Sequence, residues 1–295
     1  MTRRVLVVGD VMLDVVVQSL APIAPTSDSP ARTRVGRGGS AANLAVALRA
    51  QASENLEVVF VGVAGSDAAA HVVETDLAQC GVVAHLSHVV GSTGVVVSLV
   101  AHGGQRAMLT DRGVNSLLTY EHVAPWLDAT LAHVHVSGYT VLDEHTRTVA
   151  TRILDAAAAL GATSSVDVCS VAPLASIGAA TFAAAVRAAT MLFANEEEAM
   201  LLAGQSDGVA ALEELSRDWR EVVVTRGARG ALARSGEVSV QARAQGGHVV
   251  DTTGAGDSAT GTYLARRLAG DDPAESLERA MFAAAQVVGG LGSRG

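Results

Sequence analysis

The sequence predicts an α/β fold with a mostly parallel central sheet, helices on both faces of that sheet and a small β-sheet lid. Short valine-rich apolar runs alternate along the chain with alanine-rich segments of helical spacing, and this alternation is typical of a parallel sheet with helices on both faces. The apolar runs are continuous, as in strands that are buried on both faces. Two segments interrupt the alternation, and we assign them to the lid.

The elements of the main sheet follow from the same pattern, in chain order. Apolar runs bounded by turn residues predict strands at residues 4–9, 58–63, 134–137, 166–168, 191–194, 222–225 and 248–251. Segments with helical spacing predict helices at residues 40–49, 68–79, 144–160, 196–203, 209–217 and 256–268. Because no linker or internal repeat is visible, we expect residues 1–295 to form one domain.

The two segments that interrupt the pattern are expected to supply lid strands, at about residues 14–36 and 91–110. In the second, "TGVVVSLVAHGGQRAML", a Gly-Gly pair separates two alternating runs, which predicts a β-hairpin. A lid that projects from an α/β sheet excludes water from a reactive centre. An exposed strand edge on such a lid favours pairing with a second copy, so we expect a homodimer.

Composition excludes several classes of function. The net charge is −9, which argues against a nucleic-acid groove, and no apolar stretch reaches the ~18–20 uncharged residues of a membrane span. We therefore expect a cytoplasmic protein that binds neither nucleic acid nor a membrane. All 21 basic residues are arginine, so Schiff-base chemistry and the lysine-dependent P-loop are excluded as well.

The stretch "DTTGAGDS", residues 251–258, follows a predicted strand and begins a predicted helix. Its glycines let the backbone approach a ligand closely, and the helix N-terminus offers unpaired N–H groups to an anion. Asp257 would repel a resting phosphate, but beside a phosphoryl acceptor it can act as a general base. The alternative is an ordinary helix N-terminus in which Asp257 is a favourable first-turn charge.

Two further motifs lie near the start of the chain. "GRGGSAAN", residues 36–43, is a glycine turn that leads into a helix and presents Asn43 to a ligand. The same motif nearly matches a hydrolase elbow with Ser40 as nucleophile, but no strand leads tightly into it and no triad is visible. "GDVMLD" places Asp10 and Asp14 at the carboxyl end of the first strand, where open α/β sheets bind ligands.

Together these motifs resemble those of the ribokinase-like (PfkB) carbohydrate kinase family. "GDVMLD", "GRGGSAAN", "TGVVVSLV", "NEEEA", "VTRGARG" and "DTTGAGDS" occur in the family's order over nearly the whole chain. The resemblance implies that ATP and Mg²⁺ are bound and that the γ-phosphoryl group is transferred to a hydroxymethyl group of a small sugar. Residue by residue, it implies the general base Asp257 and an anion hole formed by Gly254, Ala255 and Gly256.

The resemblance also implies roles at the other motifs. The sugar hydroxyls would be held by Asp14, Gly38, Gly39 and Asn43. Mg²⁺ and phosphate would be organised through water by Asn195 and Glu198, although "NEEEA" also reads as a helix cap with first-turn glutamates. The nucleotide groove would be lined by Thr225, Gly227 and Gly230, and a K⁺ ion would be bound near Asp251 and Thr253. Without lysine, charge neutralisation falls to Mg²⁺, helix-end amides and, from its place beyond the hairpin, Arg106.

Several alternatives for the acceptor stay open. No aromatic residue precedes Phe60, where a nucleoside kinase would be expected to stack a base, so a free sugar is favoured. A phosphosugar is the closer rival, because Arg32, Arg34 and Arg37 flank the glycine turn and arginine suits phosphate. A different class is a sugar- or nucleotide-binding sensor that has lost catalysis. The sequence departs from the family pattern at two places. Ala259 stands where phenylalanine is common, and "DVCS" at residues 167–170 does not follow the D-x-N variant of many sugar-acid kinases.

Overall fold

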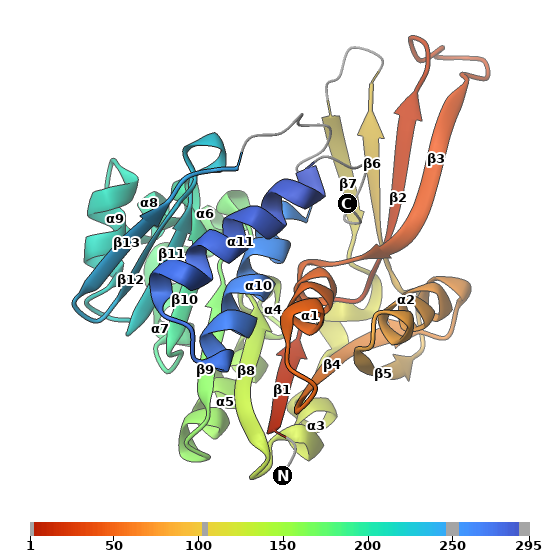
Figure 1. The fold of residues 1–295 in the computed structure, drawn as a ribbon. Coiled ribbons are helices and arrows are strands. Elements are labelled where there is room, and N and C mark those ends of the chain that lie inside the picture. The colour runs from red at the N-terminus through yellow and green to blue at the C-terminus, as the bar shows by residue number, and fades with distance from the viewer. Residues whose placement is uncertain (1–2, 102–105, 246–253, 289–295) are drawn as a thin grey trace.

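A nine-stranded sheet forms the centre of the computed structural model, which describes residues 3–101, 106–245 and 254–288 (Figure 1). Its strand order is β13-β12-β11-β10-β9-β8-β1-β4-β5. Neighbours from β11 to β5 pair in parallel, whereas β12 pairs antiparallel with both β11 and β13. The strands are β1 (Arg3–Val8), β4 (Leu56–Gly65), β5 (Val83–Val89), β8 (Leu131–Ser137), β9 (Thr163–Asp167), β10 (Met191–Asn195), β11 (Glu221–Thr225), β12 (Ala231–Ser235) and β13 (Val238–Ala242).

Helices cover both faces of this sheet. The sheet divides the hydrophobic core into two layers, because alternate strand residues point to opposite faces. On β1, Val5 and Val7 pack with one set of helices and Leu6 and Val8 with the other. The first set is α1 (Ser40–Gln51), α2 (Ala68–Gln79), α10 (Ala255–Ala269) and α11 (Pro273–Val288). The second is α3 (Tyr120–Val123), α4 (Gly138–Leu142), α5 (Arg147–Ala159), α6 (Val171–Ile177), α7 (Ala179–Val186), α8 (Glu196–Ala203) and α9 (Gly208–Leu215).

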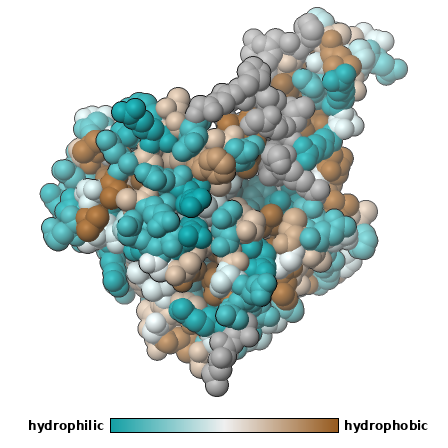
Figure 2. Space-filling view, in the orientation of Figure 1, coloured by the Kyte–Doolittle hydropathy of each residue, from teal (hydrophilic) through white to brown (hydrophobic). Residues whose placement is uncertain are grey.

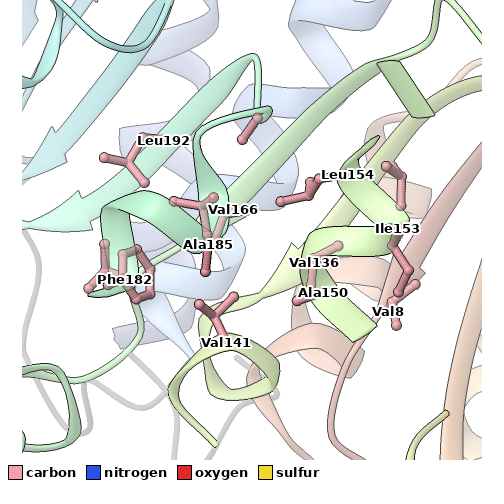
Figure 3. Close-up of a cluster of buried hydrophobic side chains, with 14 of the residues drawn as sticks. Val8, Val136, Val141, Ala150, Ile153, Leu154, Val166, Phe182, Ala185 and Leu192 are labelled. Carbon is pink, nitrogen blue, oxygen red and sulfur yellow. The ribbon is translucent and has the colours of Figure 1, made fainter. Parts of the chain in front are cut away.

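The predicted double-sided burial of the apolar runs is confirmed in both layers. Figure 3 shows the second layer, where Val8, Val136 and Val166 of adjacent strands meet side chains of α5 and α7. Each of these three valines is fully buried. In the described ranges, no helix combines the length and the apolar character needed to cross a lipid bilayer.

A second, four-stranded sheet projects from the main body, with β3 and β7 at its edges (Figure 1). Its strands are β2 (Met12–Ser19), β3 (Ala31–Gly38), β6 (Gly94–Val100) and β7 (Arg106–Asp111). The central pair β2–β6 is parallel, and each of these strands has an antiparallel partner, β3 or β7. The predicted lid and the predicted hairpin within residues 91–110 are therefore confirmed.

Several elements differ from the sequence prediction. The strand expected at residues 248–251 lies outside the described residues. Strands β5, β12 and β13 were not predicted, because each is short or half-exposed and mixes polar with apolar residues. The helix expected at residues 144–160 begins at Arg147, since Asp143 to Thr146 form the turn that follows α4. Helices α6 and α7 were also missed, as their short alanine-rich runs carry little periodic signal.

Candidate active site

A cavity of about 580 Å³ lies between the lid and the carboxyl ends of the parallel strands. From the lid it is lined by Met12 and Asp14 of β2, by Val96 of β6, and by Met108 and Thr110 of β7. The main body supplies residues in or just after the carboxyl-terminal parts of β1, β9, β10 and β11, together with the first turns of α1 and α10. Both sheets therefore enclose one space, with the helix N-termini at its wall.

Asp257 lies in the first turn of α10 and faces this cavity. Ser40 Oγ donates a hydrogen bond of 2.6 Å to Asp257 Oδ1, and Asn43 Nδ2 donates one of 3.0 Å to Oδ2. Desolvation raises the pKa of Asp257, and the hydrogen bonds from Ser40 and Asn43 oppose that shift. The carboxylate is thus poised to accept a proton from a group bound in the cavity.

The turn before α10 requires glycine at one position. Gly254 is the helix N-cap. Its backbone φ is 77°, a left-handed conformation that residues other than glycine rarely adopt. Ser258 N donates a 2.8 Å hydrogen bond to Gly254 O, which closes the first helical turn. The N–H groups of this first turn have no partner within the helix and can bind an anion.

Two more acidic side chains, Asp167 and Glu198, line the same cavity as Asp257. Asp167 accepts hydrogen bonds from Cys169 N and Thr260 Oγ1, at 3.1 and 3.3 Å. Burial, together with the charges of Glu198 and Asp257, raises the pKa of Asp167 well above its usual value. A cation bound beside these carboxyl groups would stabilise their charged forms against this desolvation.

Arg112, which the sequence analysis did not single out, also lines the cavity. Arg112 Nη2 lies 2.8 Å from Asp10 Oδ1, and Nη1 lies 3.3 Å from Asp143 Oδ2. The Arg112 guanidinium carbon is 5.9 Å from the centre of the Tyr139 ring. Desolvation raises the pKa of Asp10, and the charge and hydrogen bond of Arg112 oppose it. These polar groups are suited to bind the hydroxyl groups of a small ligand.

Comparison with known proteins decides the family. A family profile described as "pfkB family carbohydrate kinase" matches residues 2–295. The chain belongs to the PfkB carbohydrate kinase family. It is 31% identical to an ATP-dependent ribose-1-phosphate kinase from Halopiger xanaduensis, over 99% of this chain and 94% of that protein. The expectation of a phosphotransferase of this family is therefore confirmed.

Solved structures confirm the ribokinase-like fold of this PfkB chain. An adenosine kinase from Sinorhizobium meliloti superposes with a TM-score of 0.88 at 23% identity, covering 100% of this chain and 96% of the other. An E. coli protein classed as a ribokinase II, solved in complex with ATP and Mg²⁺, superposes with a TM-score of 0.85 at 20% identity, covering 99% and 94%. At these identities the likeness establishes the fold.

The structure brings half of the predicted site residues of this PfkB chain to one cavity. Its wall includes Asp14, Gly39, Asn43, Asn195, Glu198, Thr225, Gly256 and Asp257. The wall does not include Gly38, Gly227, Gly230, Gly254 and Ala255. Asp251 and Thr253 lie outside the described residues, as does the side chain of Arg106, whose backbone begins β7.

Close packing accounts for two of the predicted glycines. A Cβ atom on Gly38 would lie 1.9 Å from Asp14 Oδ1, so glycine leaves room for the Asp14 carboxylate. Gly230 has a φ of 83°, and a Cβ there would lie 2.0 Å from Ala242 O. Gly230 therefore permits the approach of the chain after β13, and its position is set by backbone packing.

The motif "NEEEA" forms a helix cap in this PfkB chain. Asn195 Oδ1 accepts a 2.9 Å hydrogen bond from Glu198 N, and Glu198 Oε2 accepts a 2.8 Å bond from Asn195 N. This reciprocal capping box fixes the start of α8. Glu198 is only 3% exposed, and burial raises the pKa of its carboxyl group. The cap thus holds a buried carboxylate at the cavity wall.

Mg²⁺ is compatible with these residues. In phosphoryl-transfer sites Mg²⁺ keeps several waters and is bound by one or two carboxylates together with substrate phosphates. Glu198 supplies such a carboxyl group, and Asp167 lines the same cavity and interacts electrostatically with it. Within the described part of the chain, no three His, Cys, Asp or Glu residues form a cage for a metal ion. Any Mg²⁺ here would be shared with nucleotide phosphates.

Proposed function

We propose that this protein transfers the γ-phosphoryl group of ATP to a hydroxymethyl group of a small sugar, with Asp257 as the general base. The observation that carries the proposal is the position of Asp257, whose carboxylate faces the cavity from the N-terminus of α10. Helix N-terminal amides suit the transferring phosphoryl group, and the adjacent carboxylate suits the proton of the attacking hydroxyl. We treat residues 1–295 as one kinase domain with an inserted lid.

The proposed mechanism is a direct in-line transfer. Asp257 takes the proton of the primary hydroxyl as its oxygen attacks, and the amides of Gly254, Ala255 and Gly256 stabilise the transferring group. Asn195 and Glu198 would hold Mg²⁺ through water, and that ion would neutralise charge on the phosphates. Closure of the lid over the cavity would exclude water.

The remaining roles follow the same assignment. The sugar hydroxyls would be bound by Asp14, Asn43, Gly38 and Gly39, with Arg106 at the lid. The nucleotide would be bound by Thr225, Gly227 and Gly230, and K⁺ by Asp251 and Thr253. We add Asp10 and Arg112 to the residues that would bind the acceptor, because their ion pair lines the same cavity as Asp14.

A phosphosugar acceptor is the second candidate, and one observation favours it. In the lid, Asp14 pairs with Gly36 and Val16 with Arg34, so Arg34 and Arg32 are in register on the same face of the sheet as the cavity-lining Asp14. Arginine binds phosphate well, and the Halopiger relative is named for a phosphosugar. Nucleosides remain a third class of acceptor. A sensor that binds sugar or nucleotide without catalysis remains the alternative from a different class of function.

A coupled assay of ADP release, with Mg·ATP and a panel of acceptors, tests the proposal. The panel contains pentoses, hexoses, sugar acids, phosphosugars and nucleosides, each with and without K⁺. We expect selective turnover of one free sugar; selective turnover of a phosphosugar would transfer the assignment to the second candidate. ATP binding without turnover of any acceptor would contradict the kinase proposal and support the sensor.

We also propose a homodimer formed through the lid. Val35 on β3 and Leu109 on β7 are 54% and 63% exposed, and apolar residues are visible on the projecting lid in Figure 2. Exposed apolar edge strands favour association. We expect a dimer at micromolar concentration in sedimentation equilibrium, and a monomer after Val35→Glu combined with Leu109→Glu. Sedimentation of the unsubstituted protein as a monomer would contradict this proposal.

A further inference from the structure

Arg37 lies at the buried end of lid strand β3 and is turned away from the acceptor cavity. It pairs with Leu13, which alternates with the cavity-lining Met12 and Asp14. Its side chain is only 3% exposed. Arg37 Nε lies 2.7 Å from Asp76 Oδ2 of α2, and Nη1 donates a hydrogen bond to Asn43 Oδ1 of α1. Arg37 therefore connects the lid to α1, the helix whose Asn43 contacts Asp257.

The chemistry of the three side chains fixes the orientation of the Asn43 amide. An arginine only donates hydrogen bonds and an ionised carboxylate only accepts them, whereas the amide does both. With Oδ1 on Arg37, the amide turns Nδ2 toward Asp257, where it donates at 3.0 Å. Without Arg37, the carboxylate of Asp257 alone would hold the amide in this orientation. Arg37 thus reinforces the orientation that suits a charged base.

Stability alone does not explain a buried arginine here. Desolvation of a buried ion pair commonly offsets its Coulomb attraction, and apolar replacements are often neutral or stabilising. The Arg37–Asp76 pair has both side chains at 5% exposure or less. The contacts of Arg37 with Asp76 and Asn43 explain why a charged side chain is kept here.

We propose that Arg37 is a positioning residue for the general base, which it holds in orientation through Asn43, and that Asp76 fixes Arg37. This inference rests on the proposed role of Asp257. The chain of contacts runs from α2 through β3 and α1 to α10. Ser40, which the sequence analysis considered as a nucleophile, completes the arrangement by donating to the other oxygen of Asp257.

The charge of Arg37 also acts on the carboxyl group of Asp257. Besides Ser40 and Asn43, the groups that interact with its charge are Arg37, Asp167, Cys169 and Tyr139. Of these described neighbours, Arg37 alone is a cation. Its charge and the Asn43 hydrogen bond both lower the pKa of Asp257, against the effect of desolvation. Loss of Arg37 should therefore raise that pKa and move the acidic limb of kcat/KM to higher pH.

The test is a double-mutant cycle on kcat with pH profiles, using Arg37→Gln and Asn43→Ala. We expect Arg37→Gln to lower the plateau kcat by about 10-fold or more, as losses of outer-sphere positioning residues do, and to shift the acidic limb upward by at least half a pH unit. Arg37→Lys, which keeps a charged donor, should recover part of both effects. In the Asn43→Ala background, Arg37→Gln should change kcat less than about twofold, since coupled residues are not additive.

A matched control separates this role from general stability. Arg4 is a second arginine in ion pairs, with Glu57 and Asp128, each at 3.1 Å, and it lies near the start of β1, away from the cavity-facing carboxyl end. Arg4→Gln should lower thermal stability without moving the pH profile. If Arg37→Gln fails to fold, Arg37→Met combined with Asp76→Leu replaces the buried pair by apolar side chains and carries the same expectations. A pH profile that superimposes on that of the unsubstituted protein, or multiplicative effects on kcat in the cycle, would overturn the proposal.

A measurement without turnover keeps this inference separate from the proposed function. The carboxyl ¹³C shift of Asp257, assigned by comparison with Asp257→Asn, reports its titration in the ligand-free protein. A higher midpoint in Arg37→Gln supports the positioning role even if no acceptor is phosphorylated. An unchanged midpoint overturns it, whatever the fate of the kinase assignment.

Discussion

Asp257→Asn is expected to lower kcat by about 10²–10⁴-fold, the usual contribution of a general base, while ATP and sugar still bind. Asparagine has nearly the same shape, and its side-chain oxygen can still accept from Ser40 Oγ, which donates at 2.6 Å in the structure. It cannot accept the proton of the attacking hydroxyl. The rate is measured by ADP release, and binding of both ligands by calorimetry.

The control for this prediction is a second carboxylate in the same cavity. Asp14 lies on lid strand β2 and lines the wall, and it is assigned to sugar binding. Asp14→Asn should raise the KM for the sugar more than it lowers kcat, the opposite split from Asp257→Asn. Unchanged kcat in Asp257→Asn would remove that residue from the catalytic role.

Gly261→Ala is expected to destabilise the protein by about 1–3 kcal/mol, as overpacking of a core does. Gly261 lies on α10 against α1, and a Cβ there would be 2.5 Å from Leu44 O and 2.9 Å from both Ala47 Cβ and Leu48 N. In most helices the same substitution would stabilise by about 0.5–1 kcal/mol. Chemical denaturation measures the change. Because the two helices carry Asp257 and its hydrogen-bond donors, their separation should also lower kcat.

Gly256→Ala is the matched control for stability. Gly256 lies on the same helix, is exposed, and a Cβ there would meet nothing within 4 Å. We expect no loss of stability from it. Equal stability of Gly261→Ala and the unsubstituted protein would show that α1 and α10 separate without cost, and that their close contact does not set the geometry of the base.

The extent to which the sequence predicted this fold depended on burial. The central strands were recognised because residues such as Val5–Val8 of β1 face helices on both sides and are continuously apolar. The edge strands β5 and β13 face solvent on one side, so their mixed composition gave no clear signal. Helix α10 was recognised from its glycine turn and its spacing, and its observed start at Ala255 differs by one residue from the prediction.

The candidate site was predicted only where a local motif marks it. Asp257 and Asn43 lie in glycine-rich turns that the sequence displays. Their hydrogen bond joins residues 214 positions apart, and no local pattern reveals it. Arg112 follows a lid strand without any motif, and it reaches Asp10 across 102 positions because both lie where the lid meets the main sheet. Contacts of this kind require the fold.

The topology of the lid has a consequence for how the chain folds. Its central pair joins Met12 to Gly94, residues 82 positions apart, and β3, α1, β4, α2 and β5 lie between them. Such a pairing carries the entropy cost of closing a long loop, and it becomes favourable once the intervening elements have brought the two strands together. The β2–β3 hairpin can form early, but the four-stranded sheet should be among the last parts to assemble. Partly folded chains would then have an ordered main sheet before the lid encloses the cavity.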